Sequence, residues 1–267
     1  MKKYWHVIGI GIQNNLTYRV NYLARTLFSF IPLFAMLSLW RTIYAQQSGA
    51  PLSGYAPAQM IFYYLMVAVV DVLTAVNEDD WQIAADIREG NISQFLLKPI
   101  DYLWYRLCLF VSGRVAFMSM ACLPLAGFIF CFRGYFVAPV TGTAFAAFLV
   151  SSLLTALLQF FISYTMAMLA FWFLEISTLI FILFAFEYLA SGHLFPLDLL
   201  PAALQHVMFY TPFPSMLYVP IAIYMGKISG TGIGQALLMQ LIWLGLAYAL
   251  ARFAWRRGIK KYAAFGG

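Results

Sequence analysis

The stretch from Gly134 to Leu174 contains no charged residue. A helix of about 20 apolar residues crosses the roughly 30 Å core of a bilayer, so this stretch can hold one span with a loop beside it. Of the whole chain, 63% is hydrophobic and only 10% is charged, against about 25% charged in soluble domains. So few charges cannot cover a soluble fold. The composition therefore excludes a soluble enzyme, a disordered protein and a disulfide-rich secreted module, and it predicts a polytopic membrane protein.

Apolar runs without charge predict six spans in an all-α integral membrane protein. A loop at about 134–142 precedes the fourth span, which fills the rest of the charge-free stretch. The third span extends back toward Trp104, and Glu175 marks a tight turn before the fifth. The other five spans are expected at about 26–44, 59–76, 112–132, 176–190 and 236–253.

The positive residues predict the orientation of these spans. Of the 16 Lys and Arg residues, 13 lie before the first span, between the second and third, or after the sixth. Only Arg41, Arg133 and Lys227 fall on the other side. Cytosolic loops carry an excess of Lys and Arg, so we expect both termini in the cytosol. The net charge of +6 thus reflects topology and does not indicate nucleic-acid binding.

Three segments outside the spans belong to the same membrane domain, which covers 1–267. The first mixes Trp5 and Ile8 with Lys3, as is typical of an amphipathic helix in the cytosolic interface. The second is a polar cytosolic loop, and the third is a long extracytoplasmic loop with turn residues Pro196, Pro201 and Pro212. These segments cover 1–25, 77–104 and 191–234.

The cytosolic loop has the pattern of a short helix. Trp81 and Ile87 contribute to its apolar side, and Gly90 can end it as a C-terminal cap. Pro99 then breaks the chain before the third span. The pattern fits either an ordinary helix in a solvated loop or a docking helix that presses Trp81 and Ile87 into a partner.

Motifs in the two polar loops carry a family resemblance. The run DIREGNI occupies 86–92, LLKPI occupies 96–100, and Tyr105 follows. In the outer loop GHLFPLDLLP occupies 192–201 and is followed by further prolines and Gly226. In their order and spacing along essentially the whole chain, these motifs make the sequence resemble the membrane subunit of an ABC transporter of the type-2 exporter superfamily. The resemblance is to drug-export-type permeases that work with a separate ATPase subunit.

This resemblance implies a connecting helix at the N-terminus, a coupling helix at about 78–90 that contacts the ATPase, and outer re-entrant or interfacial helices that cap the transport path. Two permease copies, or this chain and a related permease, would pair with two ABC-type ATPase subunits in a bacterial plasma membrane. The partner would bind ATP and Mg²⁺, and this chain would bind no cofactor. The implied coupling residues are Trp81, Asp86, Ile87, Arg88, Glu89 and Gly90.

Ionisable residues inside spans are costly and mark functional candidates. Asp71 lies in the second predicted span, and Glu187 lies in the fifth, near His193. Each either lines or gates a pathway, or makes a structural ion pair or hydrogen bond. Phe160 and Tyr164 belong to an aromatic stripe that either faces an amphiphilic substrate or packs inside the protein.

Two other functions remain open. The chain could be a regulatory, assembly or immunity subunit without a transport role. An intramembrane transferase could use Glu78, Asp79 and Asp80 to bind a magnesium diphosphate, but such sites use two acidic clusters and the sequence has one.

Several kinds of site are not expected in this chain. The piece that starts at Gly226 lacks the glycine spacing of a phosphate-binding loop, so ATP hydrolysis is expected in a separate subunit. The three cysteines predict neither a disulfide framework nor a metal site. No catalytic residue is predicted.

Overall fold

The computed structural model describes residues 2–17, 19–47, 50–74 and 79–262. These residues are almost all helical; they contain one isolated β-bridge, between Leu52 and Tyr55, and no strand. The α-helices are α1 (Lys2–Thr17), α2 (Arg19–Gln46), α3 (Pro57–Thr74), α4 (Asp79–Arg88), α5 (Ile92–Leu96), α6 (Tyr102–Cys131), α7 (Gly142–Ala167), α8 (Ser177–Ala190), α9 (Ala202–Phe209), α10 (Tyr218–Tyr224) and α11 (Thr231–Lys261). Short 3-10 helices are η1 (Met168–Phe171), η2 (Leu197–Leu199) and η3 (Phe213–Met216).

Within these described residues, five helices are long and apolar enough to cross a membrane. The all-α prediction is confirmed, and the five helices correspond to five of the predicted spans. The remaining predicted span corresponds to α8, whose 14 residues reach only about 21 Å at 1.5 Å per residue. Six spans therefore stay a prediction. The five long segments are Thr26–Gln46, Pro57–Thr74, Tyr102–Cys131, Gly142–Phe171 and Thr231–Lys261.

Some predicted boundaries differ from those in the structure. The interfacial helix was expected over 1–25, but α1 ends at Thr17, and residues 19–25 begin the long helix α2. The last long helix starts at Thr231, inside the predicted outer loop. Residues 75 and 76, expected at the end of the second span, lie outside the described part of the chain.

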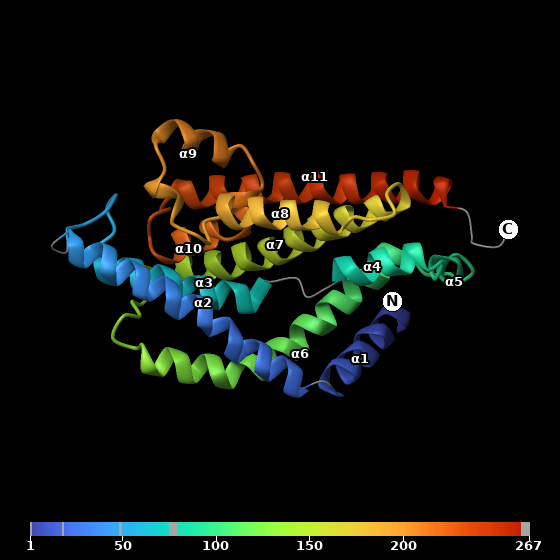
Figure 1. The fold of residues 1–267 in the computed structure, drawn as a ribbon, viewed down its shortest axis with the longest axis horizontal. Coiled ribbons are helices and arrows are strands. Elements are labelled where there is room, and N and C mark those ends of the chain that lie inside the picture. Colours follow the sequence, from blue (N-terminus) through green and yellow to red (C-terminus); the bar gives the residue numbers. More distant parts are fainter. Residues whose placement is uncertain (1, 18, 48–49, 75–78, 263–267) are drawn as a thin grey trace.

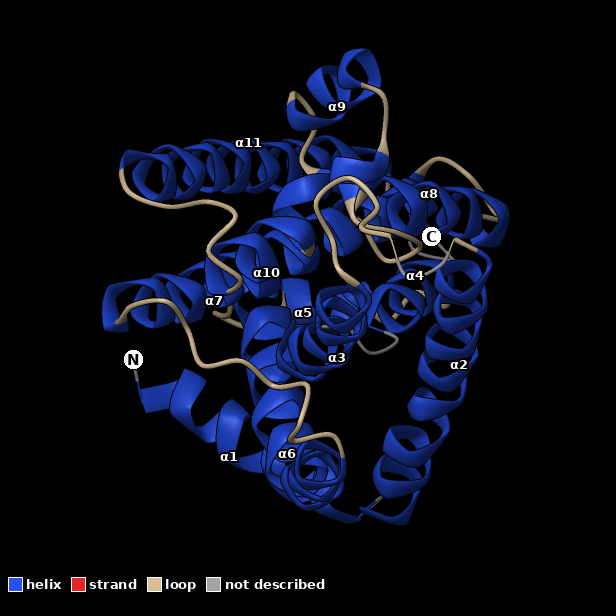
Figure 2. Ribbon diagram, turned by 90° about the vertical axis from the view of Figure 1, so that its left-hand side faces the viewer, coloured by secondary structure: helices blue, strands red, loops and turns tan. Residues whose placement is uncertain are grey.

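The long helices pack side by side (Figure 1). α1 lies along α6, α11 lies along α7, and α2 packs on both α3 and α6. Seen from the turned direction, α3 lies inside the bundle between α2, α6 and α7 (Figure 2). α1 and α6 approach closely at Gly11, where an added Cβ would overlap the Ser112 Oγ. Glycine therefore permits the α1–α6 contact.

Buried apolar side chains form two main clusters at opposite ends of the bundle. One cluster joins α2, α3 and α10 and is rich in Tyr and Phe. The other joins α4, α6, α7, η1 and the later part of α11. At this second end, the Arg252 Nη1 also lies 2.6 Å from the Asp101 Oδ2, which ties α11 to the start of α6. The short helix α4 is thus part of the packed core.

Candidate functional site

The first candidate site is the surface formed by α4, α5 and the turn between them. One side of α4 packs inward, since Ile83 and Ala84 are inaccessible to solvent and Ile87 is 5% exposed. The predicted insertion of Ile87 into a partner is therefore wrong for this structure, because α7 and η1 already cover that side of α4. Trp81 is 39% exposed and Glu89 is also exposed, so the outer side remains accessible.

Asp86 connects α4 to α6. Its Oδ2 accepts a hydrogen bond of 2.8 Å from the Tyr102 hydroxyl. The Arg106 Nη2 lies 3.9 Å from the same oxygen, at the outer limit of an ion pair. These contacts make Asp86 an internal anchor of α4.

Gly90 forms the turn after α4, as predicted. The helix ends at Arg88, a half-buried residue, and Gly90 has a φ of +80°, which is the left-handed region that favours glycine. Its carbonyl accepts a hydrogen bond of 2.8 Å from the Tyr262 hydroxyl and one of 2.7 Å from the Ser93 Oγ. The turn is therefore held by a residue just beyond the end of α11.

The segment after this turn exposes apolar side chains. Leu97 is 89% exposed and Leu96 is 52% exposed. The backbone nearby is fixed, because the Lys3 ammonium donates to the Pro99 carbonyl and the Asp101 carboxylate accepts the Trp104 N–H at 3.2 Å. A fixed segment that presents two leucines can bury them only against lipid or another protein.

The acidic run at the start of this loop consists of Glu78, Asp79 and Asp80. Glu78 lies outside the described residues, and so do the side chains of Asp79 and Asp80. Their predicted roles, in coupling or in a transferase, stay predictions.

The second candidate site lies between α3 and the end of α8. The His193 Nε2 is 3.0 Å from the Asp71 Oδ1, and its Nδ1 is 2.7 Å from the Ser191 Oγ. The ring of Tyr188 stacks on His193 at 5.0 Å between centroids. Glu187 is half-buried nearby. The structure therefore brings together the two predicted carboxylates, and His193 pairs directly with Asp71.

The chain turns back after α8 and inserts its backbone against the middle of α3. The Tyr63 hydroxyl donates to the Gly192 carbonyl at 2.8 Å, and the Tyr64 hydroxyl donates to the Leu194 carbonyl at 2.6 Å. Gly192 has a φ of +101°, and a Cβ there would lie 2.7 Å from the Tyr63 Oη. Only glycine fits this turn.

The other arm of this segment is held by α7 and α11. The Ser215 carbonyl accepts hydrogen bonds from the Thr155 Oγ1 at 2.8 Å and the Gln240 Nε2 at 2.9 Å. The two arms meet where the Tyr218 N–H donates to the Ser191 carbonyl at 3.1 Å. Buried non-helical backbone needs such partners. The mid-helix polar side chains thus support a segment that dips into the bundle.

Phe160 and Tyr164 point into the packed interior of this chain. Both are buried, and the Phe160 ring lies 5.1 Å from that of Phe110. The Tyr164 ring lies 6.4 Å from that of Tyr102. Their contacts are those of core residues, and the role predicted for them in a pathway stays a prediction.

The predicted turn prolines each precede a short helix. Pro196 precedes η2, Pro201 precedes α9 and Pro212 precedes η3. In this region the Asp198 carboxylate accepts hydrogen bonds from the hydroxyls of Tyr55 at 2.5 Å and Tyr218 at 2.7 Å. Burial raises the pKa of Tyr55 well above its ordinary value, so this hydroxyl stays a donor.

Sequence reasoning missed several of these functional contacts. The Tyr262 hydroxyl and the Gln240 amide were not singled out, although an amide in the middle of an apolar span is a signal that it has a partner. His193 was associated with Glu187 and not with Asp71, which lies 122 residues away. Long-range pairs of this kind leave no local pattern.

Comparisons with known proteins agree with this membrane architecture. The model of the family described as ABC-2 family transporter protein matches residues 30–266. No curated protein matches the chain. The family match includes all five long apolar segments apart from the first residues of α2. The chain is therefore an integral membrane protein that belongs to the ABC-2 transporter family.

Proposed function

We propose that this chain is the permease subunit of an ATP-driven ABC exporter, and that the α4–α5 surface couples it to a separate ATPase. The observation that carries the proposal is the combination of exposed side chains and internal anchors on this surface. Trp81 and Leu97 face outward, while Asp86 and Gly90 are held from within.

This arrangement suits the transmission of a movement. A partner that pulls on α4 acts on α6 through Asp86 and Tyr102. It acts on α11 through Gly90 and Tyr262, and on α7 through direct packing. Because interiors are close-packed, a displaced element moves its neighbours. Three of the long helices would therefore respond to nucleotide binding in the partner, which holds the ATP and Mg²⁺.

A second permease, identical or related, is proposed to face α8 and Asp71. Only Ile180 and Ala190 of the 14 residues of α8 are buried, so one chain leaves this helix largely uncovered. The Asp71 side chain is 40% exposed. A carboxylate within a span faces water or protein rather than lipid. A path between two copies, lined by Asp71 and Glu187, satisfies this requirement.

The proposed orientation places α4, α5 and both termini in the cytosol of a bacterial cell. Arg256, Arg257, Lys260 and Lys261 all lie at the end of α11, the end that contacts the α4–α5 turn. Positive residues concentrate on the cytosolic side. The ATPase would bind there, and export would run from this end toward α9 and α10.

The experiment is affinity purification of the tagged chain from its native membranes in mild detergent, followed by quantification of associated subunits. We expect an ABC-type ATPase in equal amount. Leu97→Ser should reduce its recovery at least several-fold, because burying a leucine contributes about 1.5–3 kcal/mol. Leu204→Ser makes the same change at an exposed leucine of α9, at the opposite end, and should leave recovery unchanged.

Two outcomes would contradict the proposal. Equal recovery of the ATPase with the two variants would show that the α4–α5 surface is not part of the interface. A wild-type chain recovered without any ATPase, under conditions that preserve other membrane complexes, would favour a regulatory or assembly subunit.

A further inference from the structure

A buried tyrosine of α7 lies at the end of the bundle where α4, α6 and α11 are joined. Tyr164 is inaccessible to solvent, and its hydroxyl has no hydrogen-bond partner within the described part of the chain. Most buried polar groups in proteins are paired. A buried hydroxyl without a partner costs free energy, because unfolding would return its hydrogen bonds to water. A conformation that supplied this hydroxyl with an acceptor would therefore be favoured.

Two contacts between helices lie next to Tyr164. Its ring is 6.4 Å from that of Tyr102, which holds Asp86 of α4 by a hydrogen bond of 2.8 Å. Asp101, at the start of α6, acts electrostatically on the Tyr164 hydroxyl, and so does Arg252 of α11. The ion pair of Asp101 with Arg252 ties α11 to α6. Tyr164 is thus close both to the anchor of α4 and to the anchor of α11.

The Asp101 carboxylate can accept the missing hydrogen bond. Its Oδ1 accepts the Trp104 N–H at 3.2 Å, and its Oδ2 accepts from the Arg252 Nη1 at 2.6 Å. A carboxylate has about four acceptor sites, so this one has sites left. Among the charged residues that act on the Tyr164 hydroxyl, the only acceptor in the described part of the chain is Asp101.

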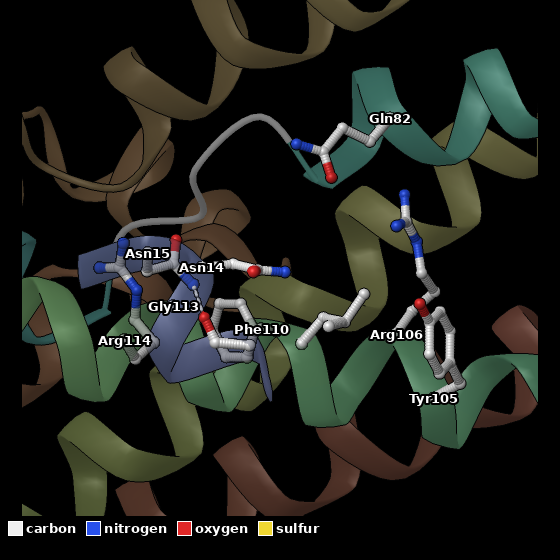
Figure 3. A pocket seen from close by; sticks show the side chains of 10 residues that line it. Asn14, Asn15, Gln82, Tyr105, Arg106, Phe110, Gly113 and Arg114 are labelled. Atoms are coloured by element: carbon white, nitrogen blue, oxygen red, sulfur yellow. Dashed lines mark hydrogen bonds between the residues drawn. The ribbon is translucent and has the colours of Figure 1, made fainter. Parts of the chain in front are cut away.

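The helix α4 has space to move relative to α6. A cavity of about 400 Å³ lies between α1, α4 and α6. Figure 3 shows Gln82 of α4 on one side of this cavity and Arg106, which rises from α6, on another. The inner side of α4 packs on α7, where Ile83 and Ala84 belong to the same buried cluster as Tyr164. A displacement of α4 into the cavity would therefore also shift α7, and with it Tyr164, relative to α6.

We propose that Tyr164 is a latch, that is, a residue whose hydroxyl donates to the Asp101 carboxylate only in a second conformation of the permease. This inference rests on the proposed function, because the partner ATPase would supply the movement of α4. A hydrogen bond to a charged acceptor would favour the second conformation roughly tenfold or more. Nucleotide binding to the ATPase and closure of the latch would then favour each other, since coupling between two sites is reciprocal.

The first measurement asks whether the Tyr164 hydroxyl is unpaired, and it needs no ATPase. It compares reversible unfolding of the full chain and two variants in mixed micelles with increasing SDS fraction. Tyr102→Phe removes the hydrogen bond to Asp86 and should raise the equilibrium constant for unfolding about tenfold. Tyr164→Phe removes a hydroxyl that makes no hydrogen bond, so this constant should stay unchanged or fall. An equal rise in the two variants would overturn the proposal.

The second measurement asks whether the latch responds to nucleotide. It determines the affinity of the reconstituted complex for a non-hydrolysable ATP analogue with Mg²⁺. Tyr164→Phe removes the hydrogen bond that the second conformation gains, so the affinity should fall roughly tenfold. Tyr224→Phe removes a half-buried hydroxyl of α10 and should change the affinity less than twofold. A purely structural role of Tyr164 would change the stability of the chain and not this affinity.

The outcomes separate the latch from the proposed function. Equal affinities of the wild-type and Tyr164→Phe complexes for the analogue would overturn the latch and leave the permease assignment in place. A wild-type chain that forms no complex with an ATPase would overturn both. An unchanged unfolding constant together with a weakened affinity in Tyr164→Phe would support the latch.

Discussion

The turn at Gly192 gives a quantitative test of the segment that dips into the bundle. Gly192→Ala places a side chain at a φ of +101°, and its Cβ would lie 2.7 Å from the Tyr63 Oη. The backbone strain costs about 1–3 kcal/mol. Displacing the buried Tyr63 hydroxyl breaks its hydrogen bond to the Gly192 carbonyl, which costs about 1–3 kcal/mol more. We expect a total loss of about 2–6 kcal/mol in the free energy of unfolding.

A double-mutant cycle separates these two contributions. Tyr63→Phe alone removes the hydrogen bond and should cost about 1–2 kcal/mol. In that background Gly192→Ala no longer meets a hydroxyl, and the next atom, the Tyr218 Cβ, is at 3.4 Å. Only the backbone strain should remain, so the costs of the two changes should fall short of additivity by about 1–2 kcal/mol.

The assay is reversible unfolding in mixed micelles with increasing SDS fraction, followed by tryptophan fluorescence. Gly245→Ala is the matched control, because no atom lies within 4 Å of its added Cβ and alanine is favoured over glycine in a helix by about 0.5–1 kcal/mol. A Gly192→Ala variant within about 0.5 kcal/mol of the wild type, or costs that add without coupling, would refute this reasoning.

Two further predictions concern coupling and the path. Tyr262→Phe removes the hydrogen bond to Gly90, so it should cost only about 0.5–1.5 kcal/mol of stability yet lower the ATPase activity of the reconstituted complex. Tyr210→Phe makes the same change at an exposed tyrosine at the other end of the bundle and should leave the ATPase activity unchanged. Equal activities of the two variants would contradict the role of the Tyr262 contact in transmitting movement. In a chain whose cysteines Cys108, Cys122 and Cys131 are replaced, Asp71→Cys should react with a charged, membrane-impermeant thiol reagent because thiolates form in water. Leu153→Cys, on the exposed apolar face of α7, should not react, and equal labelling would exclude a water-filled path at Asp71.

Much of the fold could be predicted because its signals are local. The loop before α7 ends at Thr141, whose Oγ1 caps the helix by accepting the Ala144 N–H at 3.1 Å. α4 ends near Gly90 because glycine alone readily adopts its positive φ. Both features depend on a few consecutive residues, and therefore they appear in the sequence.

The contacts that bury one side of α4 and the turn that follows α8 could not be predicted in the same way. Ile87 was expected to need a partner, since nothing local shows that η1 and α7 cover it. The apolar run at 176–190 predicted the bounds of α8 to within one residue, since the helix covers Ser177–Ala190. What the run does not show is that Gly192 then turns the chain back toward Tyr63, because the partner of that turn is far away in the sequence.

The hydrogen bonds of the dipping segment also constrain how the protein is made. Ser215 is synthesised before Gln240, which follows it by 25 residues and donates to its carbonyl. Until the last long helix has entered the membrane, that carbonyl has the Thr155 hydroxyl as a donor but lacks the Gln240 amide, so the segment is less well paired when it is buried. Its full set of hydrogen bonds therefore cannot form in chain order. We expect the segment to remain at the membrane surface during biogenesis and to pack into the bundle only after α11 has been inserted. Assembly of the whole bundle would then depend on insertion of the last helix.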